Sequence, residues 1–185
     1  MTTSSSESNW RRFQELIETR ELPALGPEPR KSRRPADEVE DLVAGFVGDH
    51  TLSDPLGVLL RSAALLWHDH LDESHAISQS IDTQDGSFLH GIMHRREPDY
   101  GNAKYWFRRV GTHSAFPGIS ARVAASLKDA GQEALLLLLC PGGRWDPFAF
   151  VDACENAGNT GQETVLREVQ AIEFESLLTD FFRRY

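Results

Sequence analysis

The sequence contains only two cysteines, Cys140 and Cys154. Two cysteines cannot build the disulfide framework of a small secreted domain, and the sequence has no CxxC pair and no Cys/His spacing of a zinc finger. Neither a cysteine nor a serine lies in a known nucleophile motif. Covalent acyl-enzyme chemistry is therefore not expected.

Long apolar runs are missing as well. The longest unbroken run, residues 134–140, is far too short to cross a bilayer, and the start MTTSSSESNWRR lacks the apolar centre of a signal peptide. Lys and Arg number 19 against 28 Asp and Glu, so the formal net charge is −9. Because basic residues dominate binding to phosphate, neither nucleic acid nor a membrane is expected as a partner. These features predict a soluble, cytoplasmic protein.

The alternation of apolar and polar residues that marks a half-buried strand is absent too. Helical periodicity predominates, and the chain of 185 residues predicts an all-α fold, a single helical domain of about seven helices over residues 36–185. Residues 1–35 are predicted to form a flexible, extended N-terminal arm with a short helix over 10–22 and a solvated basic cluster around Arg30. The run at 133–140 fits a buried strand or a helix. The seven predicted helices cover 36–48, 55–80, 100–110, 119–130, 148–157 and 162–184, and a span from near Asp85 or Ser87 to Glu97.

Histidine is concentrated in one stretch: residues 60–109 hold five of the seven. In a helix over 55–80, His68, Asp72 and His75 lie on one face, at positions i, i+4 and i+7. In the next helix His90, His94 and Glu97 share a face in the same way. The short connection between the two helices predicts antiparallel neighbours with a site between them.

His90 and His94 have the i, i+4 spacing that lets two imidazoles of one helix bind a single metal ion. The glutamate that follows the first histidine in zinc proteases is replaced by Gly91, so only the ligand geometry agrees with that motif. A third ligand could be His75, His68, Asp72 or Glu97, and zinc or non-haem iron would fit such a set. The competing interpretation is a group of hydrogen-bonded, half-buried histidines without a metal.

The same residues also permit acid/base chemistry without a metal. A carboxylate partner such as Asp72 or Glu97 would fix the tautomer of a histidine and raise its pKa, which suits proton transfer in an elimination, isomerisation or hydrolysis. His90, His94, His75 and Glu97 are the predicted catalytic residues.

Positive charge follows directly after the histidines. Residues 95–109 include five basic side chains and only two acidic ones. Arginine suits bidentate binding of carboxylate or phosphate, and aromatic rings can wall a pocket for a sugar-like molecule. The alternative is that the arginines form internal salt bridges and the aromatic rings belong to the core. The predicted substrate-binding residues are Arg95, Arg96, Tyr100, Lys104 and Arg109.

Together these patterns predict a lyase or hydrolase that acts on a small anionic or sugar-like molecule at a His/carboxylate site, with or without a metal. The second hypothesis is a non-catalytic helical module that binds a ligand or a protein and uses the histidines as a structural network.

The stretch LWHDHLDESH, followed by DTQDGSFLHGIMHRREPDYGNAKYWFRRVGTH, resembles a family of small bacterial and fungal proteins that carry a near-identical HGIMHRREPDYxNAKYWFRRVG signature. The resemblance covers roughly residues 60–113, with WDPFAFVD as a second landmark. It implies one domain centred on this stretch and assigns no catalytic role.

Overall fold

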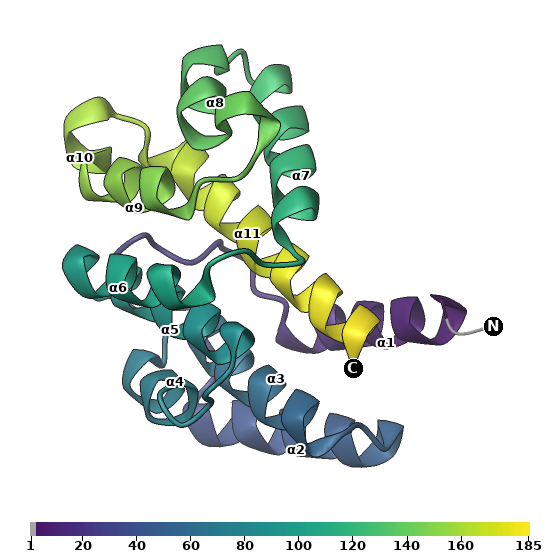
Figure 1. Cartoon of the computed structure of the whole chain (residues 1–185). Coiled ribbons are helices and arrows are strands. Elements are labelled where there is room, and N and C mark those ends of the chain that lie inside the picture. Colours follow the sequence, from purple (N-terminus) through teal and green to yellow (C-terminus); the bar gives the residue numbers. More distant parts are fainter. Residues whose placement is uncertain (1–2) are drawn as a thin grey trace.

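The computed structural model of the chain describes residues 3–185, and within that range all regular structure is helical (Figure 1). No helix in this range is long and apolar enough to cross a membrane. The elements are α1 (Thr3–Ile17), α2 (Ala36–His50), α3 (Asp54–Trp67), α4 (Leu71–Ser78), α5 (Gln84–Arg96), α6 (Tyr100–Val110), α7 (Phe116–Asp129), α8 (Glu133–Leu139), the 3-10 helix η1 (Pro141–Gly143), α9 (Pro147–Glu155), α10 (Ala157–Thr160) and α11 (Glu163–Arg184).

The all-α prediction is confirmed, but the described residues form eleven α-helices where about seven were predicted. The helix predicted over 55–80 is interrupted and forms α3 and α4. The ambiguous run at 133–140 folds as α8, the arm contains a full helix α1, and α10 is a single additional turn. The helix over 100–110 was predicted with the bounds that α6 has.

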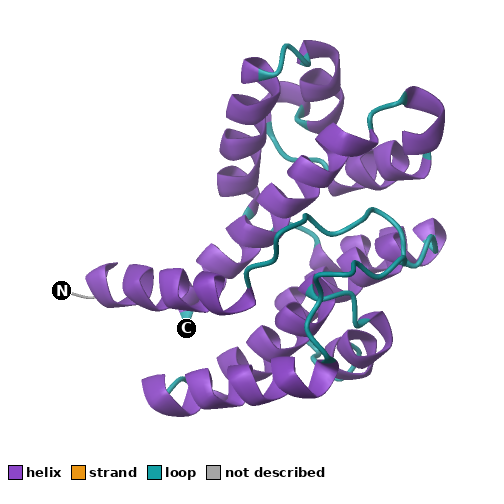
Figure 2. Ribbon diagram, turned by 180° about the vertical axis from the view of Figure 1, so that it is seen from behind, coloured by secondary structure: helices purple, strands orange, loops and turns teal. Residues whose placement is uncertain are grey.

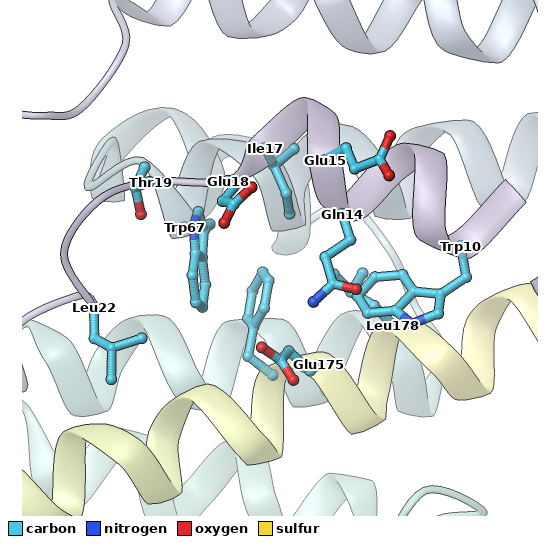
Figure 3. A pocket seen from close by; sticks show the side chains of 11 residues that line it. Trp10, Gln14, Glu15, Ile17, Glu18, Thr19, Leu22, Trp67, Glu175 and Leu178 are labelled. Carbon is cyan, nitrogen blue, oxygen red and sulfur yellow. The ribbon is translucent and has the colours of Figure 1, made fainter.

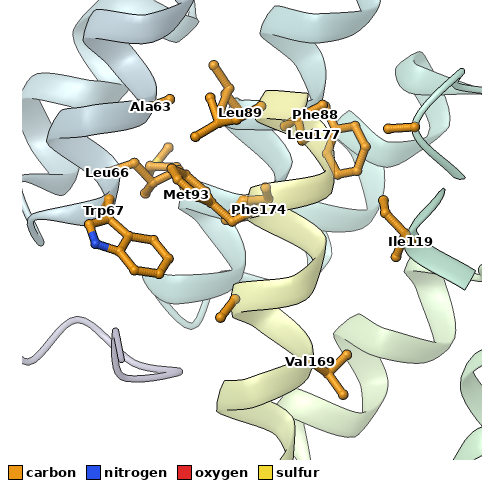
Figure 4. Close-up of a cluster of buried hydrophobic side chains, with 14 of the residues drawn as sticks. Ala63, Leu66, Trp67, Phe88, Leu89, Met93, Ile119, Val169, Phe174 and Leu177 are labelled. Carbon is orange, nitrogen blue, oxygen red and sulfur yellow. The ribbon is translucent and has the colours of Figure 1, made fainter. Parts of the chain in front are cut away.

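Helix α5 lies at the centre of the fold. All of its residues from Asp85 to Arg96 are buried, and α6, α4 and α3 pack around it. Figure 1 shows α2–α6 in one half of the molecule, α7–α10 in the other, and α11 between them. Side chains from both halves meet on α11 in the apolar core, among them Leu66, Met93, Ile119 and Leu177 (Figure 4).

The arm is packed against this body. Phe13 of α1 is fully buried beside Phe46 and Phe182, with ring centroids 5.3 and 5.7 Å away. The extended segment after α1 runs across the molecule, as the view from behind shows (Figure 2). Within the predicted solvated cluster, Lys31 and Arg33 are exposed, but Arg30 is buried because it pairs with a buried carboxylate.

That carboxylate is Asp69, which lies where the predicted long helix breaks. Asp69 has a positive φ of 65°, a conformation that ends α3 and that few residues other than glycine adopt readily. Its oxygens accept hydrogen bonds from Arg30 Nε at 2.8 Å and Arg96 Nη2 at 2.7 Å. Burial alone would raise the pKa of Asp69, but the two guanidinium groups outweigh it and lower the pKa below its ordinary value. The ion pairs therefore hold the break in place.

A second buried carboxylate fixes the chain end. Asp85, in the first turn of α5, accepts hydrogen bonds from His113 Nε2 at 2.8 Å, the Tyr185 hydroxyl at 2.9 Å and Arg184. Burial would raise the pKa of Asp85, but these hydrogen bonds outweigh it and lower the pKa to about 2. The C-terminal end of α11 is thereby attached to the start of the central helix.

The first prediction concerns Gly86. A Cβ atom at this position would lie 2.3 Å from the carbonyl oxygen of Ile81, so the α4–α5 connection would have to move. We expect Gly86→Ala to lower the free energy of unfolding by about 1–3 kcal/mol in urea titrations. Gly45→Ala is the matched control, because a Cβ there meets nothing within 4 Å and should stabilise α2 by up to about 1 kcal/mol. If the free energy of unfolding rose equally in both variants, the close contact at Gly86 would be contradicted.

The second prediction concerns stability in acid. The pKa of Asp85 is depressed in the folded state, so its contribution is complete above the ordinary value of 3.8 and is lost as the pH falls towards about 2. The shift corresponds to about 2 kcal/mol. We expect Asp85→Asn to lower the free energy of unfolding by about this amount at neutral pH and to flatten its decline between pH 4 and 2. The control, Asp41→Asn on the exposed side of α2, should lose stability between pH 4 and 2 as steeply as the wild type. If Asp85→Asn lost stability just as steeply, Asp85 would not be the group with the depressed pKa.

Candidate metal centre

Three histidines converge where α4 packs on α5. His75 comes from α4, and His90 and His94 come from successive turns of α5. One ring nitrogen from each lies within 4.8 Å of the other two. The ring centroids of His75 lie 4.7 Å from His90 and 5.1 Å from His94. Tetrahedral zinc with Zn–N bonds of about 2.0–2.1 Å needs nitrogens about 3.4 Å apart, so a small side-chain movement would close the set.

The helix break at residues 68–70 decides which histidine from this part of the chain reaches α5. His68 ends α3 and its Nδ1 accepts a hydrogen bond from the Arg34 backbone N–H at 3.2 Å, while Asp72 is exposed in the first turn of α4. Neither belongs to the cluster. The predicted face of His68, Asp72 and His75 is therefore corrected: it required a continuous helix, and the chain turns at Asp69.

His90 is the most enclosed member. It is 2% exposed and stacks between the Trp106 ring, with centroids 3.9 Å apart, and the His94 ring at 4.7 Å. Among the described residues neither of its ring nitrogens has a hydrogen-bond partner. Burial, reinforced by the neighbouring His94 and His75, lowers the pKa of His90 to about 3. The ring is therefore neutral at physiological pH, the form that binds metals.

His94 carries the polar partners. Its Nδ1 lies 3.0 Å from Glu97 Oε2, and its Nε2 lies 3.1 Å from the Asn102 side-chain amide. Burial lowers the pKa of His94, and the Glu97 carboxylate offsets this only in part. A carboxylate behind one imidazole nitrogen is the usual outer partner of a metal-binding histidine. With Nδ1 bonded to Glu97, Nε2 is the nitrogen that could bind a metal, in exchange for the contact with Asn102.

Helix α6 covers one side of the cluster. Asn102 and Trp106 are four residues apart on the face that meets His94 and His90. Gly91 permits this approach, because a Cβ there would lie 3.1 Å from the ring of Phe107. In the zinc-protease motif the catalytic glutamate stands at the position that corresponds to Gly91. In this chain that position lies at the contact between α5 and α6, where a side chain would meet Phe107.

The predicted substrate-binding arginines divide into two groups. Arg95 is fully buried, forms an ion pair with Glu173 at 2.5 Å and lies 4.2 Å over the Phe150 ring. Arg96 binds Asp69 and the Leu66 carbonyl oxygen. For both side chains the structure shows the alternative left open above, internal ion pairs.

The third predicted arginine stays near the cluster. Arg109 is 44% exposed in its side chain, pairs with Asp82 at 2.9 Å and lies 5.2 Å from the centroid of Trp106. A cation is therefore one aromatic ring away from His90.

Tyr100 and Lys104 lie on the side of α6 that meets α9. Lys104 binds Asp152 of α9, and burial together with Cys154 and Glu155 raises the pKa of the Tyr100 hydroxyl. Neither residue is brought to the histidines. Glu97, by contrast, lies at the rim of the cluster with its side chain 28% exposed.

Asn102 was missed by sequence reasoning, and for the aromatic rings of this stretch, which include Trp106, both a pocket wall and the core were left open. The available signal was their i, i+4 spacing on a helix that directly follows the histidine pair. Only the pairing of α5 with α6 turns that spacing into contacts with His94 and His90.

Comparisons with known proteins add no assignment. No family model matches the chain, and neither a curated protein nor a solved structure shows significant similarity.

The third prediction separates the structural arginines from the site. Arg95→Met leaves the Glu173 carboxylate buried without its partner, so we expect a loss of about 3–5 kcal/mol in the free energy of unfolding. The double variant Arg95→Met/Glu173→Leu should recover most of this loss, because both charges are removed.

The matched control is the exposed pair Arg61–Glu40, in which Arg61→Met should cost less than about 1 kcal/mol. If Arg95→Met were as mild as Arg61→Met, the pair would not be the buried ion pair that the structure describes.

Proposed function

We propose that this protein is a metal-dependent enzyme of the hydrolase or lyase class, with zinc bound by His75, His90 and His94. The observation that carries the proposal is the convergence of three imidazole nitrogens within 4.8 Å, one of them on a buried ring without a hydrogen bond. Three histidines with a fourth position left for water or substrate are a typical catalytic zinc arrangement.

The unpaired ring of His90 favours a metal over a purely structural network. Buried polar atoms in folded proteins nearly always have a partner, and a hydrogen-bonded network would supply one. Among the residues that the structure describes, His94 has such partners and His90 has none. A bound cation would satisfy His90 and would also explain why three imidazoles are packed together in a site that disfavours protonation.

Zinc fits this set better than non-haem iron. The iron triad of two histidines and one carboxylate would need Glu97 to leave His94 and become a ligand. With Glu97 as the outer partner of His94, the three histidines remain as the ligands, and the orientation of His94 is fixed from behind.

The chemistry follows from the donor set. Zinc held by three neutral histidines lowers the pKa of a bound water to about 7 and polarises a carbonyl or phosphoryl oxygen. The chain itself contributes His75, which is only half-buried and gives access from solvent, and Glu97, which orients His94.

The substrate that best fits the surroundings is a small anionic molecule. Arg109 is the predicted anion-binding residue that lies near the cluster, on the far side of one aromatic ring. Its exposed guanidinium can exchange Asp82 for a substrate carboxylate or phosphate. The half-buried Trp106 ring offers a surface on which a sugar-like ring could stack.

The contacts of His94 with Glu97 and Asn102 support a second candidate function. They fit a non-catalytic binding or interaction module in which the histidines stabilise the packing of α4, α5 and α6. The two candidates differ in whether His90 binds a metal or only packs against Trp106.

The fourth prediction tests the metal site. After removal of metals with a chelator, titration with zinc should show one site per chain by calorimetry, confirmed by elemental analysis. His90→Ala and His94→Ala should abolish stoichiometric binding, and Glu97→Gln should weaken it by about 10–100-fold as an outer partner. His50→Ala, a histidine of α2 outside the cluster, should bind zinc as the wild type does.

Circular dichroism shows whether each variant is still folded. If a folded variant no longer binds zinc, the loss is due to the missing histidine and not to unfolding. Equal zinc binding by wild type, His90→Ala and His94→Ala would refute the metal centre. Failure of the wild type to bind zinc, with strong destabilisation of both variants, would support the structural network instead.

A further inference from the structure

A cavity of about 220 Å³ lies between α1, the segment that follows it, the end of α3 and the middle of α11 (Figure 3). The lining residues used in the argument are Trp10, Gln14, Glu18, Trp67, Phe174 and Glu175. The volume is smaller than that of a typical site for a drug-sized ligand, so it suits one compact group.

Aromatic rings form much of the wall. Trp67 and Phe174 have ring centroids 5.0 Å apart, and Trp10 lies at the other end of the cavity. The faces of such rings carry negative potential and attract cations, tryptophan most strongly. Several rings around one small space are the arrangement that recognises organic ammonium ions.

Carboxylates complete the negative lining. Glu18 is exposed beside Trp67 and pairs with no described basic side chain, whereas Glu175 shares its charge with Arg122 at 2.5 Å. Arg30 also lies 5.8 Å from the centroid of Trp67, but it does not line the cavity: its buried guanidinium is directed to Asp69 and the Trp67 carbonyl oxygen. The cavity therefore favours a positive ligand.

Two hydrogen-bond donors lie near the rings, the indole of Trp67 and the amide of Gln14, and only the amide reaches the cavity. Trp67 is 9% exposed, and its indole Nε1 is buried with no hydrogen-bond acceptor among the described residues. A buried N–H without a partner is uncommon in folded proteins. Because this N–H has no accessible surface, it is out of reach of a ligand in the cavity. The Gln14 amide does reach the space and could donate a hydrogen bond to an oxygen close to the ammonium group of a ligand (Figure 3).

We propose that this cavity binds a small organic ammonium ion that bears a hydroxyl or carbonyl oxygen, such as a quaternary amino alcohol. The aromatic rings of Trp10, Trp67 and Phe174 line the space for the cation, Glu18 balances its charge, and the Gln14 amide donates to the oxygen.

This site is separate from the proposed metal centre. Trp67 and Phe174 line a neighbouring small gap together with Ile92 and Arg96 of α5. Ile92 lies two residues from both His90 and His94, and Arg96 lies two residues after His94. A separation of two residues corresponds to a rotation of about 200° around the helix. The two sites therefore lie on opposite sides of α5, and either can fail without the other.

The fifth prediction uses choline as the probe and its uncharged isostere 3,3-dimethylbutan-1-ol as the comparison, with the full-length chain. The four indole N–H signals in a nitrogen-15 correlation spectrum are assigned with Trp→Phe variants. We expect choline to shift the signals of Trp10 and Trp67 saturably and to leave those of Trp106 and Trp145 in place. The isostere should bind about tenfold more weakly, because it keeps the shape and loses the charge.

Glu18→Gln should weaken choline binding by about three- to tenfold, since an exposed carboxylate beside the rings is lost. Its matched control is Glu168→Gln, an exposed glutamate of α11 outside the cavity, which should bind as the wild type does. The proposal is overturned if the isostere binds as tightly as choline, if both glutamate variants behave alike, or if all four indole signals move together. An absence of any shift at saturating choline would overturn it as well.

Discussion

The pairing of the Asp69 carboxylate with two arginines is the constraint from which the rest of the architecture follows. A buried carboxylate is costly unless cations and hydrogen bonds compensate it, and here the compensation comes from two distant parts of the chain. Arg30 brings the extended segment after α1 onto the body, and Arg96 brings the end of α5. Because Asp69 has a left-handed backbone conformation, α3 ends there and α4 starts in a new direction. That direction places His75 against α5, so the ion pairs also determine the composition of the histidine cluster.

The same logic explains why the central helix is so polar. A helix that is buried on all sides is usually apolar throughout, but α5 carries charged and histidine side chains and is nevertheless fully buried. Each polar side is matched by a different neighbour: Arg95 by Glu173 of α11, Arg96 by Asp69, and the histidines by α4 and α6. Such a helix fits only one arrangement of its neighbours, which favours a precisely positioned site.

Local patterns predicted much of this fold, and non-local pairs set the limit. The all-α class, the bounds of α6 and the shared face of His90 and His94 follow from periodicity and from signals such as Pro98 and Gly111, which act within a few residues. The break at Asp69 carries no proline or glycine, and its cause lies in Arg30 and Arg96, each more than 25 residues away in sequence. The partner of Arg95 is 78 residues distant, so the shortage of nearby acids left both an internal salt bridge and an anionic ligand open. Contacts of this kind cannot be read from spacing alone.

Comparison with the zinc-protease motif shows how helix packing limits which residue can follow the first histidine of the pair. In that motif the glutamate follows the first histidine and faces the metal-bound water. Here the corresponding Gly91 lies against Phe107, and the gap is too small even for a methyl group without displacement of the ring. Among the described residues, Glu97 at the end of α5 is the carboxylate that pairs with an imidazole of the cluster. Its position behind His94 suits the orientation of a ligand better than the activation of a water. In a metal-bound state, with the three histidines as ligands, a proton-transfer group would then have to come from the substrate or from solvent.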